Sequence, residues 1–413
     1  MKILKLKIYK LYIWAMIICM TNFFGFYKYL PFGMIFYTVD YMYLCILSIS
    51  LLFLLFLLIG KGHEKIKIGA FWKCSLGLII LIGLEIIWTY VRYHQPFILT
   101  LKEGFYYIIP LFTYFIFLQF RSTKLSAKNI CDIFVMGSIL ASLVAIVAFI
   151  LYTYVGINIL QLADDAINFR YGTIRFHVGT LVVYMAVIIS LTRVFGKSYA
   201  SIDIINLILA LFHILVINKT RTIILYFIIM TLVVMLIEKR MKKAIKAFVI
   251  LLIAVCLFGI FISFDTISGD VANYVNQEAG IKIRFDTINF YMKQFIEVPV
   301  LGMGLISNSR EVEGWQLLFG PKGYYYRDDV GIIGLLNKFG IAGLLWSVFL
   351  IKSINDKLKN IKTIEAKSVR NILLYFIISI INLSFMDQQR VMYIFVVMMI
   401  AEKILREEIE KFQ

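Results

Sequence analysis

The sequence predicts an all-α, polytopic membrane protein of about twelve transmembrane helices, with one large outward loop between the ninth and tenth spans. Three observations predict this fold class. Hydrophobic residues make up 61% of the 413 residues, against roughly 45–50% in soluble domains. The mean hydropathy is +0.87. The apolar stretches are also continuous over about 17–25 residues, the length of a membrane-crossing helix, whereas the strands of a membrane barrel would alternate.

The spans follow one another along the whole chain. We expect them at residues 9–27, 32–59, 70–91, 104–120, 130–152, 174–192, 202–217, 222–237, 245–264, 329–351, 370–386 and 390–405. Residues 265–327 form the one sizeable segment expected outside the membrane, an extracytoplasmic loop with short amphipathic helices. Residues 1–413 are therefore expected to form a single integral membrane domain.

The net charge of +17 mainly indicates the orientation of the spans. If the N-terminus lies inside, 26 of the 42 basic residues fall in inward segments, and every inward segment is basic. Inward loops are enriched in Lys and Arg, so both termini are expected in the cytoplasm. Nucleic-acid binding would instead require a folded basic face, which the sequence does not offer. No nucleic-acid partner is expected.

Arginine and lysine are distributed differently on the outward side. Eight of the thirteen arginines fall there, but only six of the 29 lysines. A guanidinium suits bidentate phosphate binding, whereas lysine is the ordinary topology residue. The excess of arginine therefore indicates an anionic ligand, although any single arginine could snorkel to headgroups or pair with an acid. The eight are Arg92, Arg170, Arg175, Arg221, Arg284, Arg310, Arg327 and Arg390.

Two outward turns carry candidate anion ligands. The first reads Arg170-Tyr-Gly-Thr-Ile-Arg175-Phe-His177, and two arginines at the mouth of one helix are costly without anions. His177 either binds substrate or forms a hydrogen bond at the helix start. In the turn Asn218-Lys-Thr-Arg221-Thr, the arginine begins a span. It needs a partner there, either a phosphate or a carboxylate from a neighbouring helix.

The outward segment contains an amphipathic helix. Its apolar stripe is expected on the membrane surface, with Arg284 directed toward the headgroups. The stripe consists of Phe285, Ile288, Tyr291, Met292 and Phe295. Pro299 ends the helix, and Gly302 and Gly304 permit a tight turn close to substrate. A purely structural interfacial helix is the alternative.

The tenth span begins with two acids. Asp328 and Asp329 follow Arg327, and acids are favourable at a helix N-terminus, so capping could explain one of them. The other is a candidate general base. The glycines that predict close packing of this span are Gly331, Gly334, Gly340 and Gly343. Lys338 lies inside the span and must face the protein interior or snorkel inward, with Glu85 of the third span as a candidate partner.

Taken in order, four stretches resemble the O-antigen polymerase and O-antigen ligase superfamily of bacterial polysaccharide assembly. They are residues 170–177, the turn at 218–222, residues 284–304 with their P-x-x-G-x-G ending, and Asp328-Asp329 followed by the Gly-rich helix. About twelve spans with a large outward loop late in the chain are also similar to the family. The resemblance therefore covers nearly the whole chain.

The resemblance implies transfer of a growing glycan from undecaprenyl pyrophosphate to the terminal sugar of a new lipid-linked repeat unit. This would occur at the outer leaflet of the bacterial cytoplasmic membrane. Cations must stabilise the departing pyrophosphate, and a base must accept the proton of the acceptor hydroxyl. The residues expected at the pyrophosphate are Arg170, Arg175, Arg221 and Arg284. The candidate bases are Asp328 and Asp329, and the other substrate contacts expected are His177, Gly302, Gly304 and Arg327.

Neither a metal nor a cofactor is expected, because the leaving group is already good and no nucleotide-binding fingerprint is present. The expected partners are undecaprenyl-pyrophosphate-linked oligosaccharides, membrane lipid, a chain-length regulator and a flippase.

One departure separates two activities within the family. Ligases resemble one another in having a histidine near the end of the large outward loop, where this chain has Asp328 and Asp329. The resemblance therefore favours a polymerase of O-antigen, capsular polysaccharide or exopolysaccharide over a ligase. A lipid-linked oligosaccharide flippase is the alternative from another class, and it would be expected to spread charges through its helices and to have two related halves.

Overall fold

The computed structural model describes residues 2–35, 37–60, 68–119, 125–161, 169–170, 173–237, 247, 251, 271–309, 312 and 314–412. The protein is all-α, as the sequence predicts, apart from one short antiparallel pair in this part of the chain. In that pair, β1 (Phe169–Arg170) lies opposite β2 (Thr173–Ile174).

The helices begin and end close to the borders of the apolar runs. In chain order they are α1 (Lys2–Met20), η1 (Phe23–Tyr29), α2 (Thr38–Gly60), α3 (Trp72–Tyr93), α4 (Phe97–Leu118), α5 (Ala127–Ile150), η2 (Leu151–Val155), α6 (Thr180–Phe195), α7 (Ser201–Phe212), η3 (His213–Asn218), α8 (Arg221–Ile237), α10 (Val271–Glu297), α11 (Trp315–Phe319), η4 (Arg327–Val330), α12 (Gly331–Leu358), α13 (Ile364–Ser379) and α14 (Val391–Phe412).

In the described part of the chain, six helices are long and apolar enough to cross a membrane, or seven if the bent pair Ile8–Met20 and Phe23–Tyr29 is one span. The six are Thr38–Ile59, Trp72–Tyr93, Phe97–Leu118, Ala127–Val155, Ser201–Asn218 and Arg327–Leu358. The expectation of twelve spans is therefore confirmed only in part. α6, α8 and α13 have 16, 17 and 16 residues, and α14 is charged after Ala401. Apart from residues 247 and 251, the span expected at 245–264 lies outside the described residues, as do residues 265–270.

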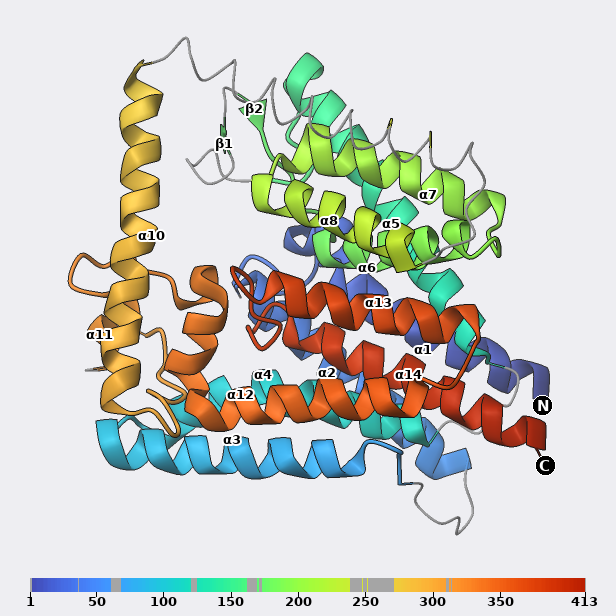
Figure 1. Ribbon diagram of the computed structural model, residues 1–413, viewed down its shortest axis with the longest axis horizontal. Coiled ribbons are helices and arrows are strands. Elements are labelled where there is room, and N and C mark those ends of the chain that lie inside the picture. The colour runs from blue at the N-terminus through green and yellow to red at the C-terminus, as the bar shows by residue number, and fades with distance from the viewer. Residues whose placement is uncertain are drawn as a thin grey trace.

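The bundle has two distinct ends. Both chain termini lie at one end, here named the terminal end, whereas α10, α11 and η4 lie at the opposite end, here named the loop end (Figure 1). At the terminal end, Glu402 and Glu407 of α14 accept hydrogen bonds of 2.7 Å from backbone N–H groups at the starts of α3 and α5. Arg406 donates to the last carbonyl of α4 at 3.0 Å. Successive helices α3, α4 and α5 therefore run in alternate directions, as expected of spans.

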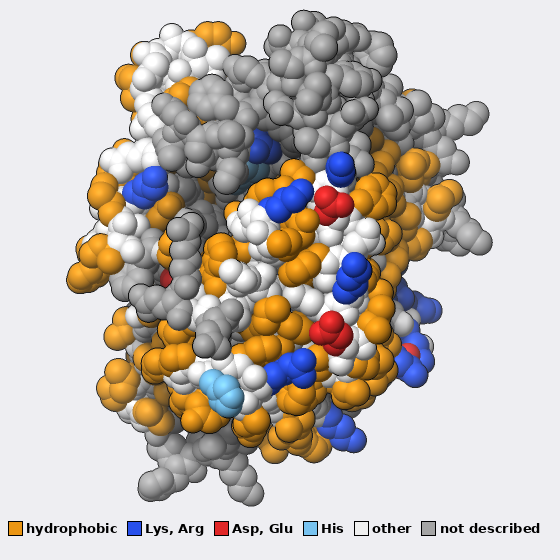
Figure 2. Space-filling view, turned by 90° about the vertical axis from the view of Figure 1, so that its left-hand side faces the viewer, with side chains coloured by type: hydrophobic (Ala, Val, Ile, Leu, Met, Phe, Trp, Pro, Cys, Tyr) orange, Lys and Arg blue, Asp and Glu red, His pale blue; other side chains and the backbone are white. Residues whose placement is uncertain are grey.

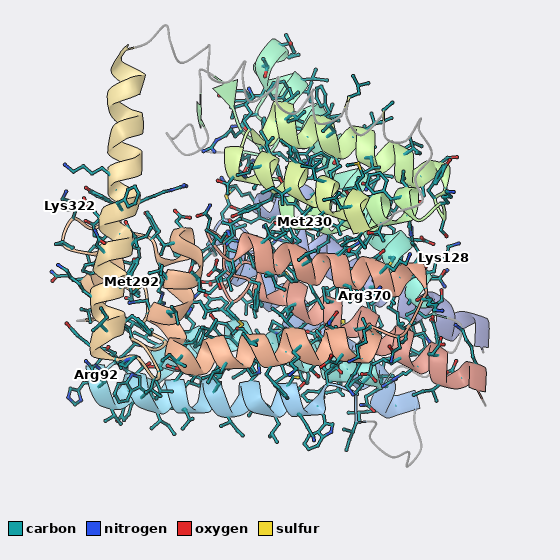
Figure 3. All side chains as sticks on the ribbon, in the orientation of Figure 1. Arg92, Lys128, Met230, Met292, Lys322 and Arg370 are labelled. Atoms are coloured by element: carbon teal, nitrogen blue, oxygen red, sulfur yellow. The ribbon has the colours of Figure 1, made fainter. Side chains whose placement is uncertain are left out.

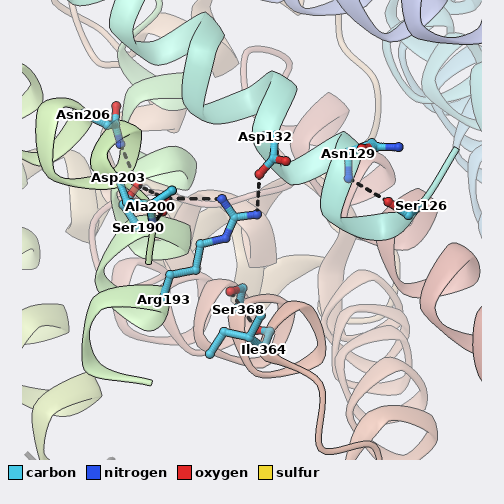
Figure 4. Close-up of polar contacts among 10 residues, drawn as sticks. All are labelled: Ser126, Asn129, Asp132, Ser190, Arg193, Ala200, Asp203, Asn206, Ile364 and Ser368. Atoms are coloured by element: carbon cyan, nitrogen blue, oxygen red, sulfur yellow. Dashed lines mark hydrogen bonds and ion pairs between the residues drawn. The ribbon is translucent and has the colours of Figure 1, made fainter. Parts of the chain in front are cut away.

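A buried arginine joins three more helices at the terminal end. Arg193, near the end of α6, pairs with Asp132 of α5 at 2.7 Å and with Asp203 of α7 at 3.3 Å (Figure 4). Asp203 also accepts hydrogen bonds from Ser190 Oγ and from the N–H of Ala200. Because two carboxylates neutralise this guanidinium, Arg193 is a structural cation at a helix junction.

α12 is broken at Gly340, and the P-x-x-G-x-G loop closes the break. Gly340 has φ +59° and ψ −158°, a conformation outside the helical region. The N–H groups of Ile341 and Ala342 donate to the carbonyls of residues 299 and 300, at 2.8 and 3.0 Å. The carbonyls of residues 337 and 338 accept from the N–H groups of residues 303 and 304, at 2.6 and 3.0 Å. The loop thus replaces hydrogen bonds that an unbroken helix would supply internally.

α10 runs across the ends of α3 and α12 rather than alongside them (Figure 1). The expectation that its apolar stripe faces the membrane is wrong at Tyr291, which is fully buried. The Tyr291 hydroxyl donates to the carbonyl of Leu318, and its ring clusters with Tyr325 and Val330. The chain after α10 folds back and covers this part of the stripe, whereas Phe285 remains exposed.

Gly340→Ala is expected to lower the stability by about 1–3 kcal/mol, the cost of holding a non-glycine residue in this backbone conformation. A clash adds to that cost, because a Cβ atom at Gly340 would lie 2.2 Å from the Val300 carbonyl oxygen. The matched control is Gly83→Ala in α3, where a Cβ meets nothing within 4 Å. Helix propensity makes this control neutral or slightly stabilising. Thermal unfolding in detergent measures the stability of both variants. Equal midpoints would contradict the close packing of the loop against the α12 break at Gly340.

Candidate functional site

A cavity of about 780 Å³ lies at the loop end, where segments from the whole length of the chain meet. Figure 2 views this end and shows single basic side chains among many hydrophobic ones. The polar and charged residues that line the cavity are Asn22, Thr38, Arg175, His177, Thr180, Thr220, Thr222, Arg284, Asp329, Tyr375, Asn382, Gln389, Arg390 and Tyr393. Its volume is in the range of small-ligand sites, about 300–1,000 Å³.

Three arginines from distant parts of the chain face this cavity. Arg175 follows β2, Arg284 lies on α10, and Arg390 directly precedes α14. Asp329 is the acidic residue among the described residues of the lining. The cavity therefore has an excess of fixed positive charge together with several hydroxyl and amide groups. These are the groups that bind phosphate oxygens in proteins.

The two adjacent aspartates of η4 have different surroundings. Asp329 is exposed in the cavity and interacts electrostatically with Arg284 and Arg390. Asp328 is half-buried and interacts electrostatically with two buried residues, Asp387 and Tyr107. Asp329 is therefore the member of the pair that a ligand in the cavity could reach.

Arg390 forms an ion pair with a buried acid. Its Nη1 pairs with the carboxylate of Asp387, which is 6% exposed. Asp387 lies in the turn between α13 and α14, and its other charged neighbours are Asp328 and Lys338. Burial and the charge of Asp328 raise the pKa of Asp387, while Arg390 and Lys338 oppose that shift. The ion pair thus orients Arg390, whose side chain also lines the cavity.

The buried charges continue into the bundle. The Lys338 ammonium lies 5.2 Å from the centre of the Tyr107 ring, and Gln388 donates a hydrogen bond to Glu103. Glu85, the partner predicted for Lys338, interacts with it electrostatically, but the two do not form an ion pair. Neither carboxylate oxygen of Glu85 has a hydrogen-bond partner among the described residues.

His177 joins the first two sequence motifs. Its Nδ1 lies 3.1 Å from Nδ2 of Asn218, which also donates to Thr180 Oγ1 at 3.3 Å. Nδ1 is thus the acceptor in this pair, as expected of a neutral ring. Burial and the nearby Arg175 lower the pKa of His177 to about 4. The hydrogen-bonding interpretation of His177 is confirmed, and its contact with substrate stays a prediction.

Arg170 and Arg221 are located by their backbone alone. Arg170 ends β1, and Arg221 begins α8 between Thr220 and Thr222, both of which line the cavity. The two arginine side chains lie outside the described part of the structure. Their phosphate-binding role stays a prediction, with Arg221 placed at the cavity by its neighbours.

Gly302, Gly304 and Arg327, predicted at the substrate, lie beside α12 and α3 and do not line the cavity. A Cβ atom at Gly302 would lie 2.5 Å from the Asn337 carbonyl oxygen, and one at Gly304 would lie 2.2 Å from Thr89 Oγ1. Arg327 Nη1 donates to the Gly304 carbonyl at 3.5 Å. The tight turn is confirmed, but the close neighbours that require glycine are helices of the protein itself.

Sequence reasoning counted Arg390 as an outward arginine but gave it no role. The signal was the stretch Asp387-Gln-Gln-Arg390, a pair of opposite charges between two apolar runs. Thr38 and Asn382 were missed because isolated polar residues at helix ends have no distinctive pattern. Within the described residues, no group of three or more His, Cys, Asp or Glu side chains is arranged to hold a metal ion.

No protein-family model matches this chain, and no curated protein matches it significantly. The family resemblance in the sequence therefore stays an expectation. The function has to be argued from the chemistry of the cavity.

His177→Gln is expected to make unfolding less sensitive to acid. The folded pKa of about 4 lies below the ~6.5 of a free histidine, so the unfolded state takes up the proton first as the pH falls. Stability from the neutral ring is fully present above pH ~6.5 and is lost toward pH ~4, by up to about 1.4 kcal/mol per pH unit. Thermal midpoints across this pH range measure the effect. A variant that loses stability as steeply as the wild type would contradict a buried neutral histidine.

Proposed function

We propose that this protein is a membrane glycosyltransferase that polymerises oligosaccharide repeat units carried on a lipid pyrophosphate. The observation that carries the proposal is the convergence of Arg175, Arg284 and Arg390 on one cavity, where Asp329 is the one acid among the described lining residues. Guanidinium groups from several directions fit a ligand with several anionic oxygens, such as a pyrophosphate.

The chemistry needs few groups. The acceptor hydroxyl oxygen forms a bond to the anomeric carbon of the donor glycan, and the bond from that carbon to the pyrophosphate oxygen breaks. The leaving group gains negative charge, which Arg284 and Arg390 stabilise from two sides of the cavity. The hydroxyl proton passes to Asp329, which is exposed to the cavity. Asp328 is assigned a positioning role through Asp387 and Arg390.

The location of the cavity supports a lipid-linked substrate. It lies at the loop end, at the ends of apolar helices, where a lipid carrier could place its pyrophosphate at the level of the headgroups. The basic segments of the sequence, such as residues 352–370 and 403–411, lie at the terminal end (Figure 1). By the positive-inside rule this end faces the cytoplasm. The cavity then faces the outer leaflet of the cytoplasmic membrane. Glycan transfer on that side has no nucleotide-sugar donor and needs a lipid-linked one.

Arg284→Ala and Arg390→Ala are each expected to reduce polymer formation by about 100-fold or more, the scale of losing one preorganised charge-stabilising contact. Arg92→Ala is the matched control. Arg92 lies at the loop end in Figure 3, is exposed, and stacks on Trp88 at 5.3 Å, away from the cavity lining. The measurement is the length of the lipid-linked glycan formed by membranes that contain equal amounts of wild type and of each variant. Normal polymer from Arg284→Ala, or equal loss from Arg92→Ala, would contradict a pyrophosphate site in the cavity.

Asp329→Asn is expected to lower the transfer rate by about 100-fold while leaving the thermal midpoint unchanged, because a general base contributes about 10²–10⁴ in rate. Asp328→Asn, the adjacent control, is expected to keep most of the transfer rate, because Asp328 is half-buried and does not line the cavity, and to keep or raise the thermal midpoint, because it removes a negative charge beside Asp387. Transfer rate and unfolding measured on the same preparations separate the two effects. Full activity of Asp329→Asn would leave Asp329 as a helix-capping residue.

Deletion of the gene from its host tests the activity itself. Single repeat units on the lipid carrier, found at the outer leaflet, are the expected result. Single units trapped at the inner leaflet would mean a flippase, and long chains retained on the carrier would mean a ligase. Either result would overturn the polymerase proposal.

A further inference from the structure

A second cavity, of about 790 Å³, lies between α12 and α13 beside the end of α8. It is separate from the loop-end cavity, and the two share no lining residue. Arg370, one of its lining residues, lies on α13 toward the terminal end (Figure 3). We name this cavity the α12–α13 groove.

The groove has a basic part and an apolar part. Lys352, Lys367 and Arg370 form the basic part, and no acidic residue is among the described residues that line the groove. The apolar part is formed by residues such as Val348 and Ile377, which are 54% and 47% exposed. Exposed apolar side chains along the wall of a basic groove indicate an amphipathic ligand.

The two parts are ordered in the same way on both helices, although the helices run in opposite directions. α13 runs from the terminal end, and along it Lys367 and Arg370 come before Leu374 and Ile377. α12 runs toward the terminal end, and along it Val348 comes before Lys352. On both helices the cations are therefore nearer the terminal end. At about 1.5 Å per residue, Ile377 lies roughly 10 Å deeper than Arg370.

Arg370 is suited to an oxygen ligand within the groove. Its Nε is buried and has no hydrogen-bond partner among the described residues. The neighbouring Asn371 is already engaged, because its Nδ2 donates to Thr192 Oγ1 at 2.9 Å. Of these two neighbours on α13, Arg370 is the one whose side chain has a nitrogen without a partner among the described residues.

We propose that the α12–α13 groove binds an anionic phospholipid of the leaflet at the terminal end. Its phosphate lies between Lys352 and Arg370, and an acyl chain lies along Val348, Leu374 and Ile377. The occupant is inferred from charge and shape. Cations at headgroup level attract an anionic headgroup, and an apolar wall that continues toward the bundle centre accommodates a chain. A zwitterionic phospholipid would bring a headgroup cation of its own close to Lys352 and Arg370, and a soluble phosphate would leave the apolar part unfilled.

Lipid titration of the purified full chain in detergent tests the proposal, with native mass spectrometry as the readout. Wild-type protein is expected to bind phosphatidylglycerol at least tenfold more tightly than phosphatidylcholine with the same chains. Lys352→Ala with Arg370→Ala is expected to abolish that preference. Lys362→Ala is the matched control, because Lys362 is an exposed cation in the α12–α13 turn outside the groove lining. This control is expected to keep the preference.

Two further variants keep the test independent of folding. Arg370→Lys retains the charge and is expected to keep most of the preference. Val348→Trp fills the exposed apolar wall without changing a charge, and it is expected to weaken phosphatidylglycerol binding about tenfold. Equal binding of the two lipids by wild type, or an equal loss in Lys362→Ala, would overturn the proposal. So would full displacement of phosphatidylglycerol by soluble glycerol phosphate, which would mean a phosphate site without a lipid.

Discussion

The break in α12 at Gly340 is the constraint on which the loop end depends. A helix interrupted in apolar surroundings leaves N–H and carbonyl groups that need partners, because lipid cannot supply them. Residues 299–304 supply those partners through four backbone hydrogen bonds. The same loop follows α10, so the joint also holds α10 across the end of the bundle. It thereby fixes Arg284, fifteen residues before Pro299, relative to Asp329, which precedes α12.

The structure uses arginine in two different ways at the two ends. Arg193 is buried at the terminal end between two carboxylates, so its charge is neutralised within the protein. At the loop end, Arg390 pairs with the carboxylate of Asp387, lines the cavity and also interacts electrostatically with the exposed Asp329. Arg284 is exposed at the same cavity. The number and position of nearby acids, rather than the residue type, therefore separate the structural arginine from the candidate ligand-binding ones.

The buried group around Lys338 connects these features. The carbonyl of Lys338 accepts a hydrogen bond from the Gly304 N–H at 3.0 Å, so Lys338 belongs to the joint between the loop and α12. The Lys338 ammonium interacts electrostatically with Asp387, which forms an ion pair with Arg390. The helix break and the cavity arginine are thus connected through two residues, Lys338 and Asp387.

The sequence by itself determined the helical class, the approximate positions of the six or seven described helices that are long and apolar enough to cross a membrane, and the gathering of Arg175, Arg284 and Asp329 at one end. Continuous apolar runs and charge asymmetry are local properties, and they fix helix position and direction. Only the tertiary structure decided that Arg390 lines the cavity, that Asp329 lines it whereas Asp328 does not, and that Gly302 and Gly304 contact α12. Those outcomes depend on which distant backbone and side-chain groups meet, and neither composition nor periodicity carries that information.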